Sequence, residues 1–282
     1  MNNFWKRTFT GVLLVSIMVG CIWLNYWTLS ILFILISILG LWEFYSLIEK
    51  SNCLPQKITG IFICIFLPVT SLYMSSTNIL GITLLSYLCL LFFSISTLLF
   101  VIELFRNKPH PFQNIGHTLI GLLYVQIPFL FLPSLAIKKN NALLTLEEQF
   151  TPYIILGFFI LIWSNDTFAY IIGRAIGKTK LYERISPKKT WEGFIGGILC
   201  TQGSAYLLGM YFTDLAPIHW HIVALLISIF GTLGDLVESM LKRSLGVKDS
   251  GNILPGHGGI LDRFDGVLIS APFVATYLML VH

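Results

Sequence analysis

Charged residues are scarce in this sequence. Asp, Glu, Lys and Arg make up 11% of its 282 residues, whereas a soluble globular domain carries about 25%. Hydrophobic residues make up 55%, and they gather in runs of roughly 20 residues, the length of a helix that crosses a bilayer. The composition therefore argues against a soluble protein with a large core, and it predicts an all-α polytopic membrane protein.

Paired cysteines are also missing. The five cysteines are Cys21, Cys53, Cys64, Cys89 and Cys200, and no two of them form a Cys-x-x-Cys motif. Four lie inside apolar runs, where cysteine usually packs as a small hydrophobic residue. Neither a disulfide framework nor a zinc site is predicted. The sequence also contains no internal repeat, no low-complexity tract and no segment typical of a soluble domain.

The apolar runs predict about nine transmembrane helices. We place them near residues 8–24, 28–48, 58–74, 79–102, 115–137, 152–173, 191–212, 218–241 and 265–281. The first run follows Lys6 and Arg7, as the apolar part of a signal peptide would. No small-residue cleavage site follows it, and the aromatic residues at 23–27 are typical of a membrane interface. We therefore interpret this run as a retained span.

Positive charge predicts the orientation of these spans. Lys and Arg favour cytoplasmic loops, and a cytoplasmic N-terminus places nearly all of them there, with Lys138 and Lys139 as the exceptions. We expect the polar segments 174–190 and 242–264 to face the cytoplasm, from a bacterial inner membrane. Residues 1–150 are predicted to serve packing, dimerisation or lipid access, and residues 151–282 to form a catalytic transmembrane half.

Two glutamates in the first half, Glu43 and Glu103, lie near predicted span ends. A charged side chain at such a position usually snorkels to the interface or pairs with a nearby cation. We assign a chemical role to neither.

Three polar segments interrupt the second half. In the first, Asp166, Tyr170 and Arg174 follow one another at intervals of four residues and so share one helical face. Asp166 lies about 12 Å along the helix from Arg174, so it must face protein or water rather than lipid. Both a structural carboxylate between two helices and a ligand-binding one would fit this position.

The second polar segment, residues 177–193, leads into a predicted helix. A helix N-terminus preceded by Lys188 and Lys189 can bind an anion, and Ser186 could add a hydroxyl donor. Thr190 is a candidate N-cap of that helix. A positive-inside loop would explain the lysines alone, but not the serine, proline, threonine and glycines around them.

Carboxylates mark the third polar segment. Asp235, Glu238 and Lys242 share one helical face, and Asp262 and Asp265 follow three residues apart after a loop. Carboxylate oxygens suit Mg²⁺, which binds through one or two carboxylates plus substrate phosphates. The pattern predicts phosphoryl or nucleotidyl transfer, in which the protein mainly positions groups and neutralises charge.

Glycines surround the histidine of this segment. Gly256, Gly258 and Gly259 allow the backbone to turn sharply and to approach a ligand. We expect His257 to orient a phosphate or a carboxylate, because one histidine does not make a zinc site.

Residues 239–265, SMLKRSLGVKDSGNILPGHGGILDRFD, resemble the signature of the phosphatidate cytidylyltransferase (CDP-diacylglycerol synthase) family. The matching positions are Ser239, Lys242-Arg243, Lys248-Asp249, Gly251, Leu254-Pro255, His257-Gly258-Gly259 and Asp262-Arg263-Phe264-Asp265. Residues 166–178, 186–193 and 234–239 are similar to further features of that family. The resemblance covers about residues 163–265.

The resemblance implies a reaction of CTP with phosphatidic acid to give CDP-diacylglycerol and pyrophosphate. It also implies a need for Mg²⁺, dependence on a monovalent cation such as K⁺, and a homodimer in the lipid bilayer that binds no nucleic acid. A phosphate monoester is already a nucleophile near neutral pH, so no general base is required.

Each polar residue then has an expected role. The residues expected to act in catalysis are Asp235, Lys242, Arg243, Lys248, His257, Asp262 and Arg263. Those expected to bind substrate are Asp166, Arg174, Lys178, Ser186, Lys188, Lys189, Thr190, Ser239, Asp249, Gly258 and Gly259. The carboxylates expected to hold Mg²⁺ are Asp235, Glu238, Asp262 and Asp265.

Two other kinds of function share some of these features. A lipid-alcohol kinase using CTP or ATP would also have membrane spans, lysines and carboxylates, but it would release a nucleoside diphosphate. A transporter with Asp166, Asp235 and Glu238 as its ion path would show discontinuous helices in two matching halves, whereas charge here is concentrated in one half. A non-catalytic scaffold would not need the cluster of glycines and carboxylates.

Overall fold

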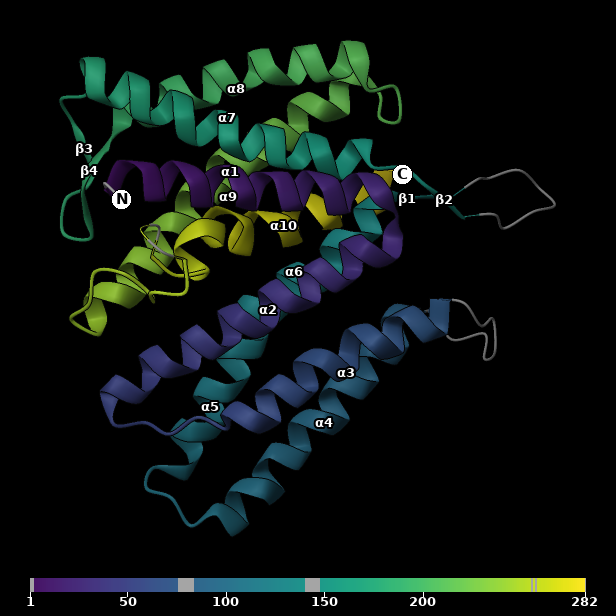
Figure 1. Ribbon diagram of the computed structural model, residues 1–282, viewed down its shortest axis with the longest axis vertical. Helices are drawn as coiled ribbons and strands as arrows, with labels where there is room; N and C mark the ends of the chain where they lie inside the picture. Colours follow the sequence, from purple (N-terminus) through teal and green to yellow (C-terminus); the bar gives the residue numbers. More distant parts are fainter. Residues whose placement is uncertain (1–2, 76–83, 140–147, 255, 257, 282) are drawn as a thin grey trace.

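The computed structural model describes residues 3–75, 84–139, 148–254, 256 and 258–281, and it consists almost entirely of helices (Figure 1). The α-helices are α1 (Asn3–Leu24), α2 (Tyr26–Ile48), α3 (Lys57–Ser75), α4 (Leu84–Arg106), α5 (Pro111–Gly121), α6 (Ile127–Phe131), α7 (Tyr153–Ile176), α8 (Trp191–Tyr211), α9 (Pro217–Ser244) and α10 (Leu261–Val281). Short non-α helical turns are η1 (Glu49–Ser51), η2 (Leu122–Gln126) and η3 (Leu132–Ala136).

The predicted spans coincide with helical segments wherever the structure describes them. Residues 79–83 of the fourth predicted span lie outside the described residues. The fifth span is irregular: it runs through α5, the π-helical turn η2, α6 and the 3₁₀ turn η3. Prolines at 128 and 133 lack the N–H that a continuous α-helix needs, which accounts for part of this irregularity.

Within the described residues, five helical segments are long and apolar enough to cross a membrane. They are Tyr26–Ser51, Pro111–Ala136, Tyr153–Ile176, Pro217–Ser244 and Leu261–Val281. Thr8–Leu24 and Lys57–Thr70 are apolar but shorter. The prediction of a mostly helical membrane protein is confirmed in this form.

Two short antiparallel ribbons depart from the all-α prediction. Strand β1 (Ile137–Lys139) pairs with β2 (Glu148–Phe150), and β3 (Lys180–Tyr182) pairs with β4 (Ser186–Thr190). The second ribbon lies in the segment that we expected to be a loop. The Trp191 N–H donates to the Thr179 carbonyl at 2.9 Å, so the ribbon delivers the chain directly into α8.

Glycines bring the helices of the second half into close contact. A Cβ on Gly193 of α8 would lie 2.7 Å from the Ala169 carbonyl oxygen of α7. A Cβ on Gly234 of α9 would lie 2.4 Å from the Asp265 carbonyl oxygen of α10. Small residues permit such approach of backbones in membrane proteins. The second contact brings the polar turns of α9 and α10 together.

Glu103 lies in a polar cluster within the first half. Its side chain is 3% exposed, and its oxygens accept hydrogen bonds from Gln56 at 2.7 Å, Asn114 at 2.8 Å and Arg106 at 2.6 Å. The expectation that a nearby cation explains this glutamate is confirmed by Arg106.

Replacing Gly157 by alanine is expected to destabilise the fold. A Cβ at this position in α7 would lie 2.2 Å from the ring of Trp220, a side chain with 0% exposure. Overpacking of this kind costs about 1 to 3 kcal/mol, which thermal unfolding in detergent would detect. The matched control is Gly203→Ala in α8, where an added Cβ meets no atom within 4 Å. Equal melting temperatures for the two variants would contradict the packing described here.

Candidate active site

A cavity of about 870 Å³ lies among α1, the β3–β4 ribbon and helices α7 to α10. This volume is within the range of small-molecule sites, about 300 to 1,000 Å³. Its lining includes nine of the residues that the sequence predicted to act in catalysis, substrate binding or metal binding: Asp166, Arg174, Lys188, Lys189, Thr190, Asp235, Asp262, Arg263 and Asp265. Residues far apart in the chain thus meet around one space.

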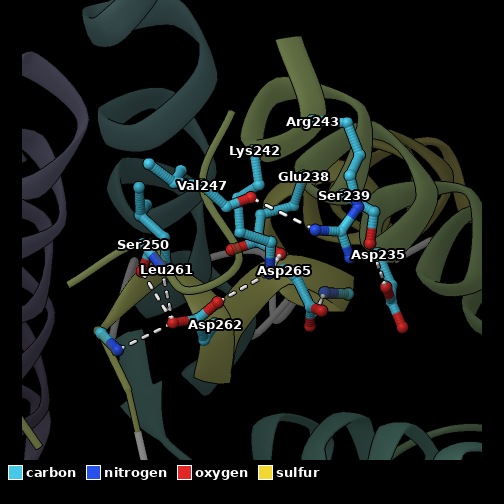
Figure 2. A network of polar contacts seen from close by, with 12 residues as sticks. Asp235, Glu238, Ser239, Lys242, Arg243, Val247, Ser250, Leu261, Asp262 and Asp265 are labelled. Atoms are coloured by element: carbon cyan, nitrogen blue, oxygen red, sulfur yellow. Dashed lines mark hydrogen bonds and ion pairs between the residues drawn. The ribbon is translucent and has the colours of Figure 1, made fainter. Parts of the chain in front are cut away.

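The remaining predicted residues do not line this cavity. Described residues in this group are Lys178, Ser186, Glu238, Ser239, Lys242, Arg243, Lys248, Asp249, Gly258 and Gly259. His257 lies outside the described residues. Lys248 and Asp249 are exposed, and Arg243 donates to the Val247 carbonyl at 3.3 Å (Figure 2).

Apolar side chains also line the cavity, and the sequence did not reveal them. They include Leu14 and Val15 of α1, Trp163 of α7 and Phe194 of α8. Helix α1 belongs to the half that we expected to serve packing, dimerisation or lipid access. The lining of the cavity therefore combines charged residues of the second half with apolar residues, two of them from the first helix.

Asp235 is held from two sides. Lys189 Nζ lies 2.6 Å from its Oδ2 atom, and the Ser239 hydroxyl donates to its Oδ1 atom at 3.2 Å (Figure 2). Lys189 comes from strand β4 and Asp235 from α9, so this ion pair joins the ribbon to the helix. Both side chains are partly exposed, which leaves them accessible to a ligand in the cavity.

Lys242 lies between two carboxylates (Figure 2). Its Nζ atom contacts Glu238 one turn earlier in α9 and donates to Asp262 Oδ1 of α10 at 2.7 Å. The Glu238 side chain is 1% exposed and that of Lys242 is 12% exposed. Charges buried to this degree require a partner. Lys242 therefore links α9 to α10, which the sequence did not indicate.

Asp262 holds the backbone that leads into α10. Its Oδ2 atom accepts hydrogen bonds from the Ser250 N–H at 2.9 Å, the Ser250 hydroxyl at 3.0 Å and the Gly259 N–H at 2.8 Å (Figure 2). Gly258 has a φ angle of +82°, and a Cβ there would lie 2.6 Å from the same oxygen. We expected these glycines to approach a ligand, but both lie against the protein's own carboxylates.

Asp265 shares the cavity with Asp166, Asp235 and Asp262. One of its oxygens accepts the Gly266 N–H at 2.7 Å, and no cation among the described residues pairs with it. Of the four carboxylates predicted to hold a metal, it is the one without a cation partner among the described residues.

Three of the four carboxylates predicted to hold a metal are paired with a lysine. Glu238 and Asp262 share Lys242, and Asp235 pairs with Lys189. In the described part of the chain, no three or more His, Cys, Asp or Glu side chains are arranged as a ligand set. A metal held by one or two carboxylates plus substrate phosphates needs no larger set.

Thr190 caps helix α8, as its sequence position suggested. Its hydroxyl accepts a hydrogen bond from the Gly193 N–H at 3.2 Å. The neighbouring Glu192 carboxylate accepts the N–H groups of Lys178 and Thr179, each at 3.0 Å. These contacts fix the ribbon against the helix, so Lys188 and Lys189 are presented to the cavity from a defined backbone.

Glu43 lies near the site, although the sequence analysis assigned it no role. It is 4% exposed, and no cation among the described residues pairs with it. The expectation of a snorkelling or cation-paired glutamate was therefore wrong. Its Oε2 atom accepts the Leu261 N–H at 3.1 Å, across 218 residues of chain. A charged residue inside an apolar run was the only available signal.

Comparison with known proteins places the chain among enzymes of one kind. A family model described as "Cytidylyltransferase family" matches residues 5–281. A phosphatidate cytidylyltransferase of Staphylococcus haemolyticus is 34% identical over 276 residues, which is 97% of this chain and 98% of the relative. One from Staphylococcus saprophyticus is 43% identical over 170 residues, 60% of each chain, and one from Staphylococcus epidermidis is 53% identical over 127 residues, 44% of this chain and 48% of the relative.

Replacing Lys242 by methionine is expected to destabilise the protein strongly. The change keeps much of the side-chain volume but leaves Glu238 and Asp262 without their shared cation. Removing one partner of a buried charge pair costs about 3 to 5 kcal/mol. Unfolding in mixed micelles should report the loss. Lys248→Met, at an exposed lysine, is the control and should melt as the unaltered protein does. A Lys242→Met variant as stable as this control would show that the network adds no stability.

Proposed function

The chain belongs to the cytidylyltransferase family, and we propose that it transfers the cytidylyl group of CTP to phosphatidate, giving CDP-diacylglycerol and pyrophosphate. The observation that carries this proposal is the cavity whose lining contains cations, carboxylates and apolar side chains. Such a space suits one polar and one lipid substrate. The full-length match to a phosphatidate cytidylyltransferase supports the same reaction.

The cations of the cavity can reduce the repulsion between the two substrates. Both substrates are polyanions, so a phosphatidate oxygen must approach the α-phosphorus of CTP against repulsion. Arg174, Lys188, Lys189 and Arg263 line the space, and we propose that they bind and neutralise the triphosphate and the lipid phosphate. Donors fixed before the reaction begins stabilise charge as it develops in the transition state.

The chemical step requires positioning rather than proton removal. A phosphatidate phosphate oxygen forms a bond to the α-phosphorus, and the bond from that phosphorus to the bridging α–β oxygen breaks as pyrophosphate leaves. The lipid phosphate is already ionised near neutral pH, so no residue need act as a base. The protein's part is to orient the two phosphates in line and to shield their charges.

The lipid would enter against the apolar residues of the lining. Leu14 and Val15 of α1, with Trp163 and Phe194, border the same cavity as the cations. We propose that the glycerol and the upper acyl chains of phosphatidate lie along these side chains while the phosphate reaches the cations. This arrangement assigns lipid access to part of the 1–150 half and the reacting phosphates to residues 151–282.

The carboxylates of α9 and α10 fit the magnesium ion that the family resemblance implies. We propose that Asp235 and Asp265, which both line the cavity and repel each other, hold Mg²⁺ together with substrate phosphates. The ion would neutralise phosphate charge when bound. Glu238 and Asp262 would instead keep Lys242 in place. A monovalent cation such as K⁺ and a homodimer remain expectations from the resemblance.

The arrangement of the connections supports the proposed topology. The start of α1, the α2–α3 and α4–α5 connections and the β3–β4 ribbon all lie toward the left of Figure 1, whereas β1–β2 and the end of α10 lie toward the right. The left-hand segments hold most of the Lys and Arg residues. By the positive-inside rule, we propose that the chain crosses the membrane of a bacterial cell nine times. The N-terminus and the charged residues of the cavity would then face the cytoplasm.

Pyrophosphate release is the direct test of the reaction. Purified protein in detergent should release pyrophosphate only when CTP, Mg²⁺ and phosphatidate are all present, so omission of any one should reduce the signal to background. Formation of CDP from CTP and a lipid alcohol, without pyrophosphate, would instead identify a lipid kinase. No turnover in either assay would refute the proposed reaction.

Replacing Asp265 by asparagine is expected to reduce kcat by about 100-fold or more, a loss typical for removal of one group that stabilises transition-state charge. The fold should survive, because asparagine also relieves the like-charge repulsion around this position. The control is Glu183→Gln in the exposed turn between β3 and β4. Turnover and magnesium dependence should be measured on both proteins. Unchanged values for Asp265→Asn would remove this residue from the metal assignment.

A further inference from the structure

A buried glutamate of the first half contacts the backbone that leads into α10. We define the α10 entry as residues 250–251 and 258–261. Glu43 Oε2 accepts a hydrogen bond from the Leu261 N–H at 3.1 Å and lies 3.2 Å from the Ser250 hydroxyl oxygen. Leu261 begins α10, where the first N–H groups have no partner within the helix. Glu43 therefore supplies an acceptor that the helix start needs.

Two glycines of the α10 entry make room for this carboxylate. A Cβ on Gly251 would lie 2.4 Å from Glu43 Oε1. A Cβ on Gly259 would lie 2.4 Å from Glu43 Oε2 and 2.0 Å from the Ser250 hydroxyl oxygen. No other residue type could occupy either position without displacing the glutamate. The close contact with Glu43 accounts for both glycines.

The same contacts reach the wall of the cavity. The Ser250 hydroxyl lies within hydrogen-bond distance of both Glu43 and Asp262, at 3.2 and 3.0 Å. Asp262 and Arg263 follow Leu261 directly, and both line the cavity. A shift of the α10 entry would therefore move two cavity-lining side chains together, and Asp265 one turn later with them.

Stability alone does not explain this glutamate. Glu43 Oε1 is buried and has no hydrogen-bond partner among the described residues, and such an atom is costly. Glu103, which is 3% exposed and is the other deeply buried glutamate among the described residues of the first half, has hydrogen bonds to both of its oxygens. Of the two glutamates, Glu43 is the one directed at the cavity-forming half.

We propose that Glu43 is a positioning residue for the reaction: the first half of the chain holds the start of α10 in its productive place through this carboxylate. The kinetic part of this inference rests on the proposed function. Its structural part, that Glu43 restrains the α10 entry, does not. The two parts are tested by different measurements.

The kinetic test compares Glu43→Ala, Glu43→Gln and the matched control Glu103→Ala. Glu43→Ala should lower kcat per folded molecule by about 10- to 100-fold, as loss of supporting contacts around an active site commonly does. Glu43→Gln keeps one acceptor oxygen and should recover most of this loss. Glu103→Ala should lower the melting temperature without changing kcat. Equal kcat values for Glu43→Ala and the unaltered protein would overturn the positioning role.

Backbone hydrogen exchange provides a readout that needs no turnover. In Glu43→Ala the Leu261 amide loses its acceptor and should exchange about tenfold faster or more. The amides of Ser250 and Gly259, which donate to Asp262, should also exchange faster because the α10 entry is no longer restrained. In Glu103→Ala their rates should not change. Unaltered exchange at these amides in Glu43→Ala would overturn the inference even if pyrophosphate release is confirmed. Faster exchange in a protein that releases no pyrophosphate would refute only the proposed reaction.

A double-mutant cycle tests the contact itself and covers the case in which Glu43→Ala does not fold. Gly251→Ala places a methyl group against Glu43 and should lower kcat by a similar factor. In the double variant the space left by Glu43 can accept that methyl group, so the two losses should not multiply. If Glu43→Ala fails to fold, the exchange and kcat changes of Gly251→Ala decide the matter, and the absence of any change in that variant would refute the proposal.

Discussion

The network around Lys242 is the interaction on which the candidate site depends. A lysine buried among apolar helices is stable only with opposite charge beside it, and Glu238 and Asp262 provide that charge from two different helices. Because one ammonium group holds both carboxylates, the positions of α9 and α10 are coupled at this level. The coupling brings Asp235 and Asp265 to the same cavity.

Close helix contacts make this network possible. Gly234 allows the backbone of α9 to approach Asp265, and Gly193 allows α8 to approach α7. In a membrane, where lipid is as apolar as the side chains, such packing of small residues is a main source of helix association. Here it also has a chemical consequence: with backbones this close, the short aspartate side chains can line one cavity.

The sequence predicted the helices well because apolar runs of membrane length are a strong local signal. It also predicted the Thr190 cap and most cavity-lining charges, because helical spacing and loop position identify which polar residues share a face. It could not predict the contribution of Leu14 and Val15, since those side chains are ordinary members of an apolar run. Glu43 was missed because its partner Ser250 is 207 residues away, and periodicity carries no information about such pairs.

The segment 239–265 contains many charged residues, but not all of them line the cavity. Lys242 and Glu238 are buried away from the cavity, whereas Asp265 and Arg263 line it. Asp262 belongs to both groups, because it faces the cavity and also binds Lys242, Ser250 and Gly259. Loss of activity on changing Asp262 would therefore not identify a metal ligand, since the same change frees Lys242 and the start of α10. Asp265 pairs with no cation among the described residues and accepts the N–H of its neighbour Gly266, so its replacement better separates metal binding from the integrity of the site.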